Sequence, residues 1–245
     1  MRCGGWLVAV VAVFALVVPV NEAEAQRTAQ VPVQVGVGPA GFLLGGPSVE
    51  EVAWEGRAFD DQPIHTGLRL SLAAVIDADL IEEHPGMVPS QYRNQLQQMG
   101  EVRFSPSIVS LIPTSLYLSP PIRNTSIWGA TWSLIGAGLA PISDPIRVTA
   151  SGSAVLSAIY MNSDAMPRDN FFFLRPGVEL QFDFEIPITD DFLISTGWAS
   201  KVHLPQAYDG GILEMGDFDA DSLWHIGEFY IQAHFRFPYS HTYGG

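Results

Sequence analysis

The feature that most constrains the fold is a regular alternation of apolar and polar residues between Leu174 and Ile186. From Val178 onward, every second side chain is apolar and the intervening ones are acidic or amide. A period of two places successive side chains on opposite faces of a β-strand, whereas a helix would distribute both kinds around its surface. The stretch therefore predicts a long strand with one apolar and one polar face, and Pro176 lies near its start, where a missing donor is tolerated.

The same alternation recurs along the chain. Further strands are predicted at 65–77, 126–140, 146–160, 192–204 and 224–237, with less regular candidates at 31–44 and 102–118. Strands in soluble proteins usually have about 5–6 residues, whereas a tilted strand that crosses a bilayer needs roughly 9–11. The lengths favour a closed antiparallel up-and-down barrel of about eight strands, with ten as the alternative count.

The connections between these segments alternate in length. Residues 141–145 and 187–190 form short connections, whereas 161–170 and 205–222 are long and polar. Membrane barrels alternate short turns at one end with long loops at the other in this way. On the same pattern, residues 45–63 form a further long loop.

One connection departs from this pattern. Residues 78–100 belong at the short-turn end but are long. Within them, residues 89–100 have the composition of one short helix between the second and third strands, with Ser90 as its cap and Gly100 as its stop.

The first residues predict export. Arg2 precedes an apolar run over residues 6–18, and the small residues Ala23 and Ala25 follow. This is the layout of a cleaved secretory signal peptide, and the run is shorter than the roughly 20 residues that a spanning helix needs. We therefore expect residues 1–25 to be removed, leaving one barrel domain over 26–245.

Composition excludes some classes of function. The formal net charge is −14, which argues against a nucleic-acid partner, because such partners require basic surface. Only 16% of residues are charged while 47% are hydrophobic. A soluble surface carries about 25–35% charged residues, so this balance favours a barrel whose apolar face meets lipid.

The end of the chain carries a family resemblance. The segment from Phe229 to Tyr239 resembles the aromatic-rich final strand of bacterial outer-membrane β-barrel proteins. Residues 222–227 are similar to a short sequence segment in uncharacterised bacterial barrel proteins. Residues 240–245 continue beyond Tyr239, whereas such strands normally end on an aromatic residue. The resemblance implies an outer-membrane location, with outer-membrane lipid and the barrel-assembly machinery as partners, and no particular chemistry.

In an outer-membrane barrel the apolar face points outward and the polar face inward. The lipid-facing residues are then Trp128, Trp132, Leu156, Leu180, Phe182, Phe184, Trp198, Phe229 and Phe235. The lumen-facing polar residues are Arg69, Arg147, Arg175, Glu179, Gln181, Asp183, Glu185, Lys201, His203, Glu228, His234 and Arg236. Because about eight strands leave an interior that side chains fill, internal ion pairing is favoured over a transport site.

Two further constellations carry weaker signals. Asp217, Asp219 and Asp221 approach the spacing of a calcium loop, with Glu228 in the distal position. Ser222 replaces the glycine of that loop, so a solvated acidic external loop is favoured over a calcium site. Some outer-membrane barrels are lipid-modifying enzymes with a Ser and a His at the lipid face, but only Ser240–His241 offers such a pair in sequence.

The sequence thus predicts an outer-membrane barrel with a structural or surface-interaction role, without catalysis and without a cofactor. Two alternatives remain open. One is a small porin-like channel. The other is a soluble periplasmic or secreted barrel of lipocalin type, which reverses the two faces.

Overall fold

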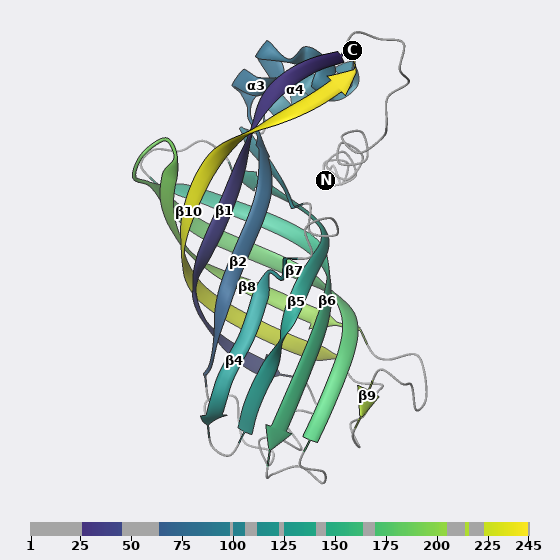
Figure 1. Ribbon diagram of the computed structural model, residues 1–245, viewed down its shortest axis with the longest axis vertical. Coiled ribbons are helices and arrows are strands. Elements are labelled where there is room, and N and C mark those ends of the chain that lie inside the picture. Colours follow the sequence, from purple (N-terminus) through teal and green to yellow (C-terminus); the bar gives the residue numbers. More distant parts are fainter. Residues whose placement is uncertain are drawn as a thin grey trace.

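The fold is an antiparallel barrel (Figure 1). The computed structural model describes residues 26–45, 64–98, 100–105, 112–122, 125–140, 146–163, 170–204, 214–215 and 223–244. The strands are β1 (Gln26–Gly45), β2 (His65–Ile76), β3 (Glu101–Ser105), β4 (Ser115–Ile122), β5 (Thr125–Ala140), β6 (Arg147–Ser163), β7 (Asn170–Pro187), β8 (Phe192–His203), β9 (Glu214–Met215) and β10 (Trp224–Gly244). The signal peptide expected at residues 1–25 lies outside the described residues.

Strand pairing closes the sheet into a ring. The order runs β1–β10–β8–β7–β6–β5, and β1 also pairs with β2. Between β2 and β5, β3 and β4 share one position: β3 pairs with the end of β2 at 74–76, and β4 pairs with its beginning at 67–69. The ring positions are therefore β1, β2, β3 with β4, β5, β6, β7, β8 and β10, which confirms the predicted barrel of about eight strands.

The two ends of the barrel differ. One end, here called the cap end, carries α3 (Ala78–Glu83), the 3-10 helix η2 (Pro85–Met87) and α4 (Ser90–Gln98), together with the start of β1 and the end of β10 (Figure 1). The other, here called the loop end, is where β1 stops at Gly45 and β10 begins at Trp224. The short β7–β8 connection lies at the cap end, closed by a bond from Ile188 N to Phe192 O of 2.9 Å.

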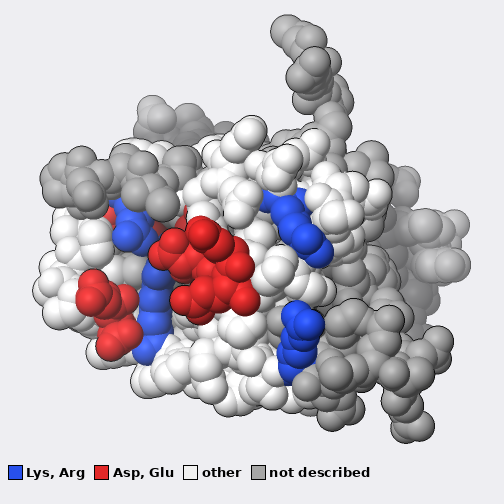
Figure 2. Space-filling model, turned by 90° about the horizontal axis from the view of Figure 1, so that it is seen from above, with Lys and Arg blue, Asp and Glu red and all other residues white. Residues whose placement is uncertain are grey.

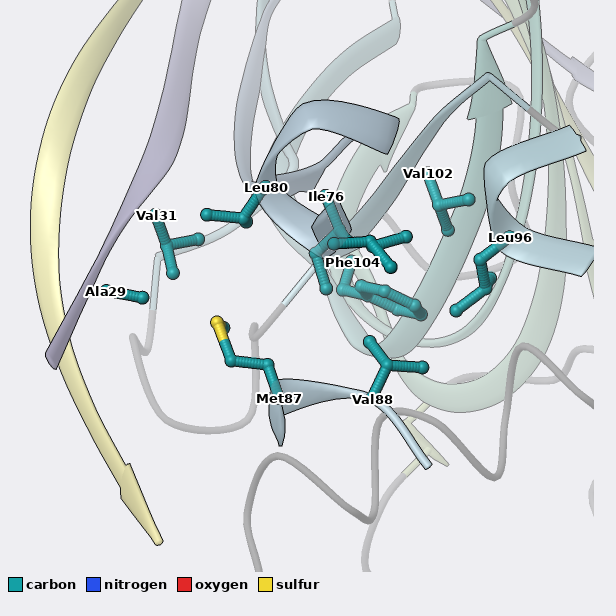
Figure 3. Packing of buried hydrophobic residues seen from close by; sticks show 10 residues of the cluster. Ala29, Val31, Ile76, Leu80, Met87, Val88, Leu96, Val102 and Phe104 are labelled. Atoms are coloured by element: carbon teal, nitrogen blue, oxygen red, sulfur yellow. The ribbon is translucent and has the colours of Figure 1, made fainter. Parts of the chain in front are cut away.

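The predicted helix corresponds to α4, but α3 and η2 were not predicted. The side chain of Asp77 caps α3 by accepting a hydrogen bond from Leu80 N at 2.8 Å. These helices, which form the helical cap, surround a separate apolar core (Figure 3). Its members are Ala29, Val31, Ile76, Leu80, Ile81, Met87, Val88, Leu96, Val102 and Phe104. None of the helices in the described part of the chain is long and apolar enough to span a membrane.

The last strand is longer than the sequence indicated. Residues 238–244 continue β10 and pair with the first residues of β1, from Gln26 opposite Gly244 to Pro32 opposite Pro238. The residues beyond Tyr239 are therefore part of a two-stranded ribbon that rises above the barrel beside the helical cap (Figure 1).

Candidate functional site: the filled lumen

Most of the polar side chains that alternate along the long strands point inward. Of the residues expected in the lumen, Arg69, Arg175, Glu179, Asp183, Glu185, Lys201, His203, Glu228 and His234 are buried, and Arg147, Gln181 and Arg236 are half-buried. Bonds between strands on different sides of the ring join many of them, as from Arg69 on β2 to Glu179 on β7. The structure thus gathers these side chains into connected networks.

A neutral charge cluster crosses the middle of the lumen. Arg69 donates two hydrogen bonds to Glu179, at 2.7 and 2.9 Å, and Lys201 forms ion pairs with Glu179 at 3.4 Å and with Glu228. None of the four side chains is more than 4% exposed. Buried charges are tolerated only when they are paired and hydrogen-bonded. This central cluster of two cations and two anions therefore ties β2, β7, β8 and β10 together across the barrel.

Neutral groups complete the central cluster. Ser115 donates to Glu228 at 2.8 Å and accepts from Arg69 and Lys201, each at 3.0 Å. The guanidinium of Arg69 lies over the Tyr230 ring at 5.2 Å, within the range of a cation–π contact. The hydroxyl of Ser115 and the ring of Tyr230 thus replace part of the water that the four charged groups lose on burial.

A second charge cluster lies nearer the cap end. Arg103 donates to both carboxylate oxygens of Glu185 and to Glu101. Arg236 donates to Glu101 at 2.8 Å, and Arg147 approaches the same carboxylate at 3.5 Å. Sequence analysis missed Glu101 and Arg103, although the alternation of Glu101-Val102-Arg103-Phe104 carries the signal that would have found them.

A chain of hydrogen bonds extends from the central cluster toward the second. Gln181 accepts from Arg69 at 2.6 Å and donates to Asp183 at 2.7 Å, while the Tyr230 hydroxyl donates to Asp183 at 2.6 Å. Thr149 donates to the same carboxylate at 3.2 Å. These bonds extend the central cluster as far as Asp183, which lies two residues before Glu185 on the same face of β7.

Toward the loop end an apolar layer fills part of the interior, beside the buried side chains of His65 and Arg175. The apolar layer consists of Phe42, Leu44, Tyr117, Ile127, Ile159, Met161, Trp224 and Ile226, each at most 1% exposed. The sequence analysis expected a polar face inside, and this layer departs from that expectation. The physical reason is the narrow bore of the barrel, which excludes water, so that packed side chains of either kind can fill it.

Two small cavities lie among the described residues of the interior. One cavity of about 70 Å³ lies between the charge clusters, and a neighbouring one measures about 40 Å³. Ser71, Ser151 and Gln181 line both of them. A water molecule needs about 10–15 Å³, so each of these two cavities is large enough for a few waters.

The outer surface carries the apolar face. Seven residues expected there are 36–55% exposed: Trp128, Leu180, Phe182, Phe184, Trp198, Phe229 and Phe235. Trp132 and Leu156 are half-buried. A soluble lipocalin-type barrel would enclose these side chains, and here they lie outside.

The structure describes only part of the candidate calcium site and all of the Ser240–His241 pair. Asp217, Asp219 and Asp221 lie outside the described residues, while Glu228 is held in the lumen by Lys201. In the described ranges, no group of three metal-binding side chains occurs. Ser240 accepts a hydrogen bond from Gln30 at 2.9 Å in the terminal ribbon, and nothing links it to His241.

Several other Ser–His pairs were missed by sequence analysis: Ser157–His203 and Ser119–His65 lie inside the barrel, and two more lie on β8 and β10. Ser195 Oγ lies 2.7 Å from His234 Nε2 inside the barrel, and Ser200 Oγ lies 2.7 Å from His225 Nε2 on the outer face. Both pairs join β8 to β10. The members lie 39 and 25 residues apart in sequence, so only the pairing of the two strands reveals them.

The cap end presents acidic surface. The α3 helix exposes Asp79, Glu82 and Glu83, and the β7–β8 connection exposes Asp190 and Asp191. Figure 2 looks onto this end and shows acidic side chains gathered near its centre. The charge here is separate from the neutral pairs of the lumen.

Solved structures of similar fold include bacterial outer-membrane proteins. The attachment invasion locus protein Ail of Yersinia pestis has a TM-score of 0.42 and 10% identity, covering 85% of this chain and 100% of Ail. Neisserial surface protein A has a TM-score of 0.44 and 11% identity, covering 86% and 99%. The outer membrane protease OmpT from Escherichia coli has a TM-score of 0.33 and 9% identity, covering 89% and 99%. No family model and no curated protein sequence matches the chain.

The fold and the lumen together define a class. The chain is a closed antiparallel barrel with an apolar outer face and an interior filled by polar and apolar side chains. The fold is compatible with many roles, so the particular role has to be argued from the sites.

Proposed function

We propose that the protein is an outer-membrane barrel that conducts no solute and acts through its surfaces. The central charge cluster carries this proposal, because its four paired side chains fill the cross-section between β2, β7, β8 and β10. Opening this path would require separating buried ion pairs, which is strongly unfavourable.

The apolar layer supports the same conclusion. It lies on the loop-end side of the central cluster, and its side chains are packed against one another and sealed from solvent. A solute moving along the axis would meet this layer as well as the two charge clusters. These successive barriers favour a structural or surface-interaction role over the porin-like alternative.

The proposal includes an orientation. Outer-membrane barrels have short turns on the periplasmic side and long loops outside, so the cap end would face the periplasm and the loop end the exterior. The acidic surface with Asp79, Glu82 and Glu83 would then be available to periplasmic partners. Insertion would depend on outer-membrane lipid and on the barrel-assembly machinery.

Conductance measurements test the proposal. Purified protein in planar bilayers is expected to give no stable current steps. A double variant, Lys201→Ala with Glu228→Ala, removes one cation and one anion and leaves the charge balanced, so it serves as a matched control that widens the lumen. Weak conductance from the variant alone would support the proposal, and stable steps from the unaltered barrel would overturn it.

A further inference from the structure

A polar pair lies within the apolar outer face. Ser200 on β8 and His225 on β10 both point outward, and Ser200 Oγ lies 2.7 Å from His225 Nε2. A hydroxyl hydrogen-bonded to an imidazole nitrogen is the arrangement that activates a serine nucleophile, because the imidazole can accept its proton. Both side chains are half-buried, which leaves part of each accessible from outside.

The surroundings of the pair leave room for a small group. Gly227 lies directly opposite Ser200 in the strand pairing. A Cβ atom placed at Gly227 would lie 3.4 Å from His225 Cε1 and 3.8 Å from Trp198 Nε1. The position beside Ser200 is therefore bordered by the imidazole on one side and by an indole N–H donor on the other.

The position of the pair along the barrel axis places it near the level of the lipid headgroups. Ser200 is three residues before the end of β8 at His203, and a strand rise of about 3.3 Å with a tilt of about 40° places it roughly 8 Å along the axis from that end. Trp198 projects from the same face and is 36% exposed. Tryptophan is enriched at the headgroup level of membranes, where the ester groups of lipids lie.

We propose that Ser200 and His225 form a nucleophile–base pair that cleaves acyl esters of membrane lipids. This inference depends on the outer face lying in a membrane, as proposed above, and it is independent of whether the lumen conducts. The sequence analysis expected no catalysis because this pair is not visible before the strands are paired.

The reaction balances with water as the second reactant. Ser200 Oγ attacks the ester carbonyl carbon while its proton passes to His225 Nε2. The bond between the acyl carbon and the alcohol oxygen then breaks, and Nε2 returns the proton to the departing alkoxide. Water next attacks the acyl-serine and gives a proton to Nε2, the acyl–Oγ bond breaks, and Oγ regains the proton. The products are a fatty acid and a lipid with one free hydroxyl, and the Trp198 N–H can donate to the oxyanion in both steps.

The barrel supplies a matched control. Ser195 and His234 lie on the same two strands at the same 2.7 Å separation, but they face the lumen. His234 also contacts Gln34 at 3.2 Å and Ser71 at 3.4 Å, so its ring is part of the internal network. This pair is buried in the lumen, so its removal tests whether a lumen-facing Ser–His pair on the same two strands accounts for activity.

The test uses the full barrel refolded into vesicles of phosphatidylethanolamine and phosphatidylglycerol. Mass spectrometry of released fatty acid and lysolipid measures the rate, and folding is checked by gel mobility before boiling. Ser200→Ala and His225→Asn are expected to lower the rate by at least about 100-fold, the usual range for loss of a general base. Ser195→Ala and His234→Asn are expected to keep it.

A second readout identifies the nucleophile directly. A fluorophosphonate probe should add its mass to Ser200 in the unaltered protein and fail to do so in His225→Asn. Vesicles made from an acylated saccharide lipid, assayed in parallel, determine which lipid class supplies the ester. The proposal is overturned if the folded barrel releases no fatty acid from either lipid, or if Ser200→Ala releases it at the unaltered rate.

Discussion

Lys201 illustrates how single residues maintain the interior. Its ammonium faces the carboxylates of Glu179 and Glu228 and is fully buried. Replacing it with methionine leaves the two carboxylates with Arg69 as their nearest cation. We expect Lys201→Met to lower the free energy of unfolding by about 3–5 kcal/mol, because one buried charge loses its partner.

Urea titration of the refolded barrel in detergent measures this effect. Arg27→Met is the matched control, since Arg27 is an exposed cation on β1, and such surface changes usually stay within about 0.5 kcal/mol. Adding Glu228→Gln to Lys201→Met should recover part of the stability. Equal midpoints for Lys201→Met and Arg27→Met would contradict the account of the central cluster.

Gly129 illustrates a backbone constraint in the wall. Its φ angle is +156°, and an added Cβ would come within 2.2 Å of Ala158 O on the neighbouring strand. We expect Gly129→Ala to destabilise the barrel by about 1–3 kcal/mol from backbone strain alone. Gly227→Ala is the comparison, because its nearest neighbour would lie 3.4 Å away; unfolding midpoints that shift equally in both variants would argue against the strain.

At the residue scale, the sequence indicates which face of the sheet each side chain occupies. Alternation assigns Glu179 and Asp183 to the lumen and Phe182 to the outer face, because neighbouring residues on one strand point to opposite sides. It does not indicate which residues on different strands meet. The Ser200–His225 pair depends on the register of β8 against β10, which the ladder of the whole barrel determines.

Among the elements, the helical cap packs its apolar residues against strand residues of β1, β2 and β3. Leu96 on α4 is 1% exposed and packs in the apolar cluster shown in Figure 3. We expect Leu96→Ala to weaken the cap by about 2–5 kcal/mol through lost burial and the cavity left behind. The barrel strands should remain folded, because their ladders involve none of the α4 residues.

Hydrogen exchange measured by mass spectrometry separates the two regions. Exchange should accelerate in residues 77–98 of Leu96→Ala and stay unchanged in β6 and β7, while Gln97→Ala, at an exposed neighbouring position, should behave as the unaltered protein. Acceleration throughout the barrel would mean that cap and barrel unfold as one unit.

Elements differ in how far the sequence indicates them. The strands β5 to β8 follow from regular alternation, and α4 follows from Ser90 and the stop near Gly100. The six-residue α3 was missed because it is too short to show a periodic face, and its cap at Asp77 becomes evident only with the bond to Leu80. Strands β3 and β4 share one position in the ring, and the sequence showed them as one irregular strand. The two pair with different parts of β2, so the alternation is interrupted between them.

At the scale of the whole molecule, apolar side chains lie outside and charges lie inside. The exposed outer residues include Phe182, Phe184 and Phe229, while the buried ones include Arg69 and Lys201. A protein in water would have to leave the first set in solvent, which is unfavourable in proportion to the apolar area. A surrounding membrane removes that cost, and a closed sheet leaves no unpaired strand edge in the lipid.

Fractionation of cells that express the full chain tests this account most directly, with the purified barrel run on gels before and after boiling. We expect the protein to sediment with outer membranes, to resist extraction by urea, and to change its mobility only on boiling, as a folded hydrogen-bonded barrel does. A periplasmic marker protein controls for incomplete lysis. Recovery in the soluble periplasmic fraction, with the same mobility before and after boiling, would contradict both the membrane placement and the roles assigned to the two faces.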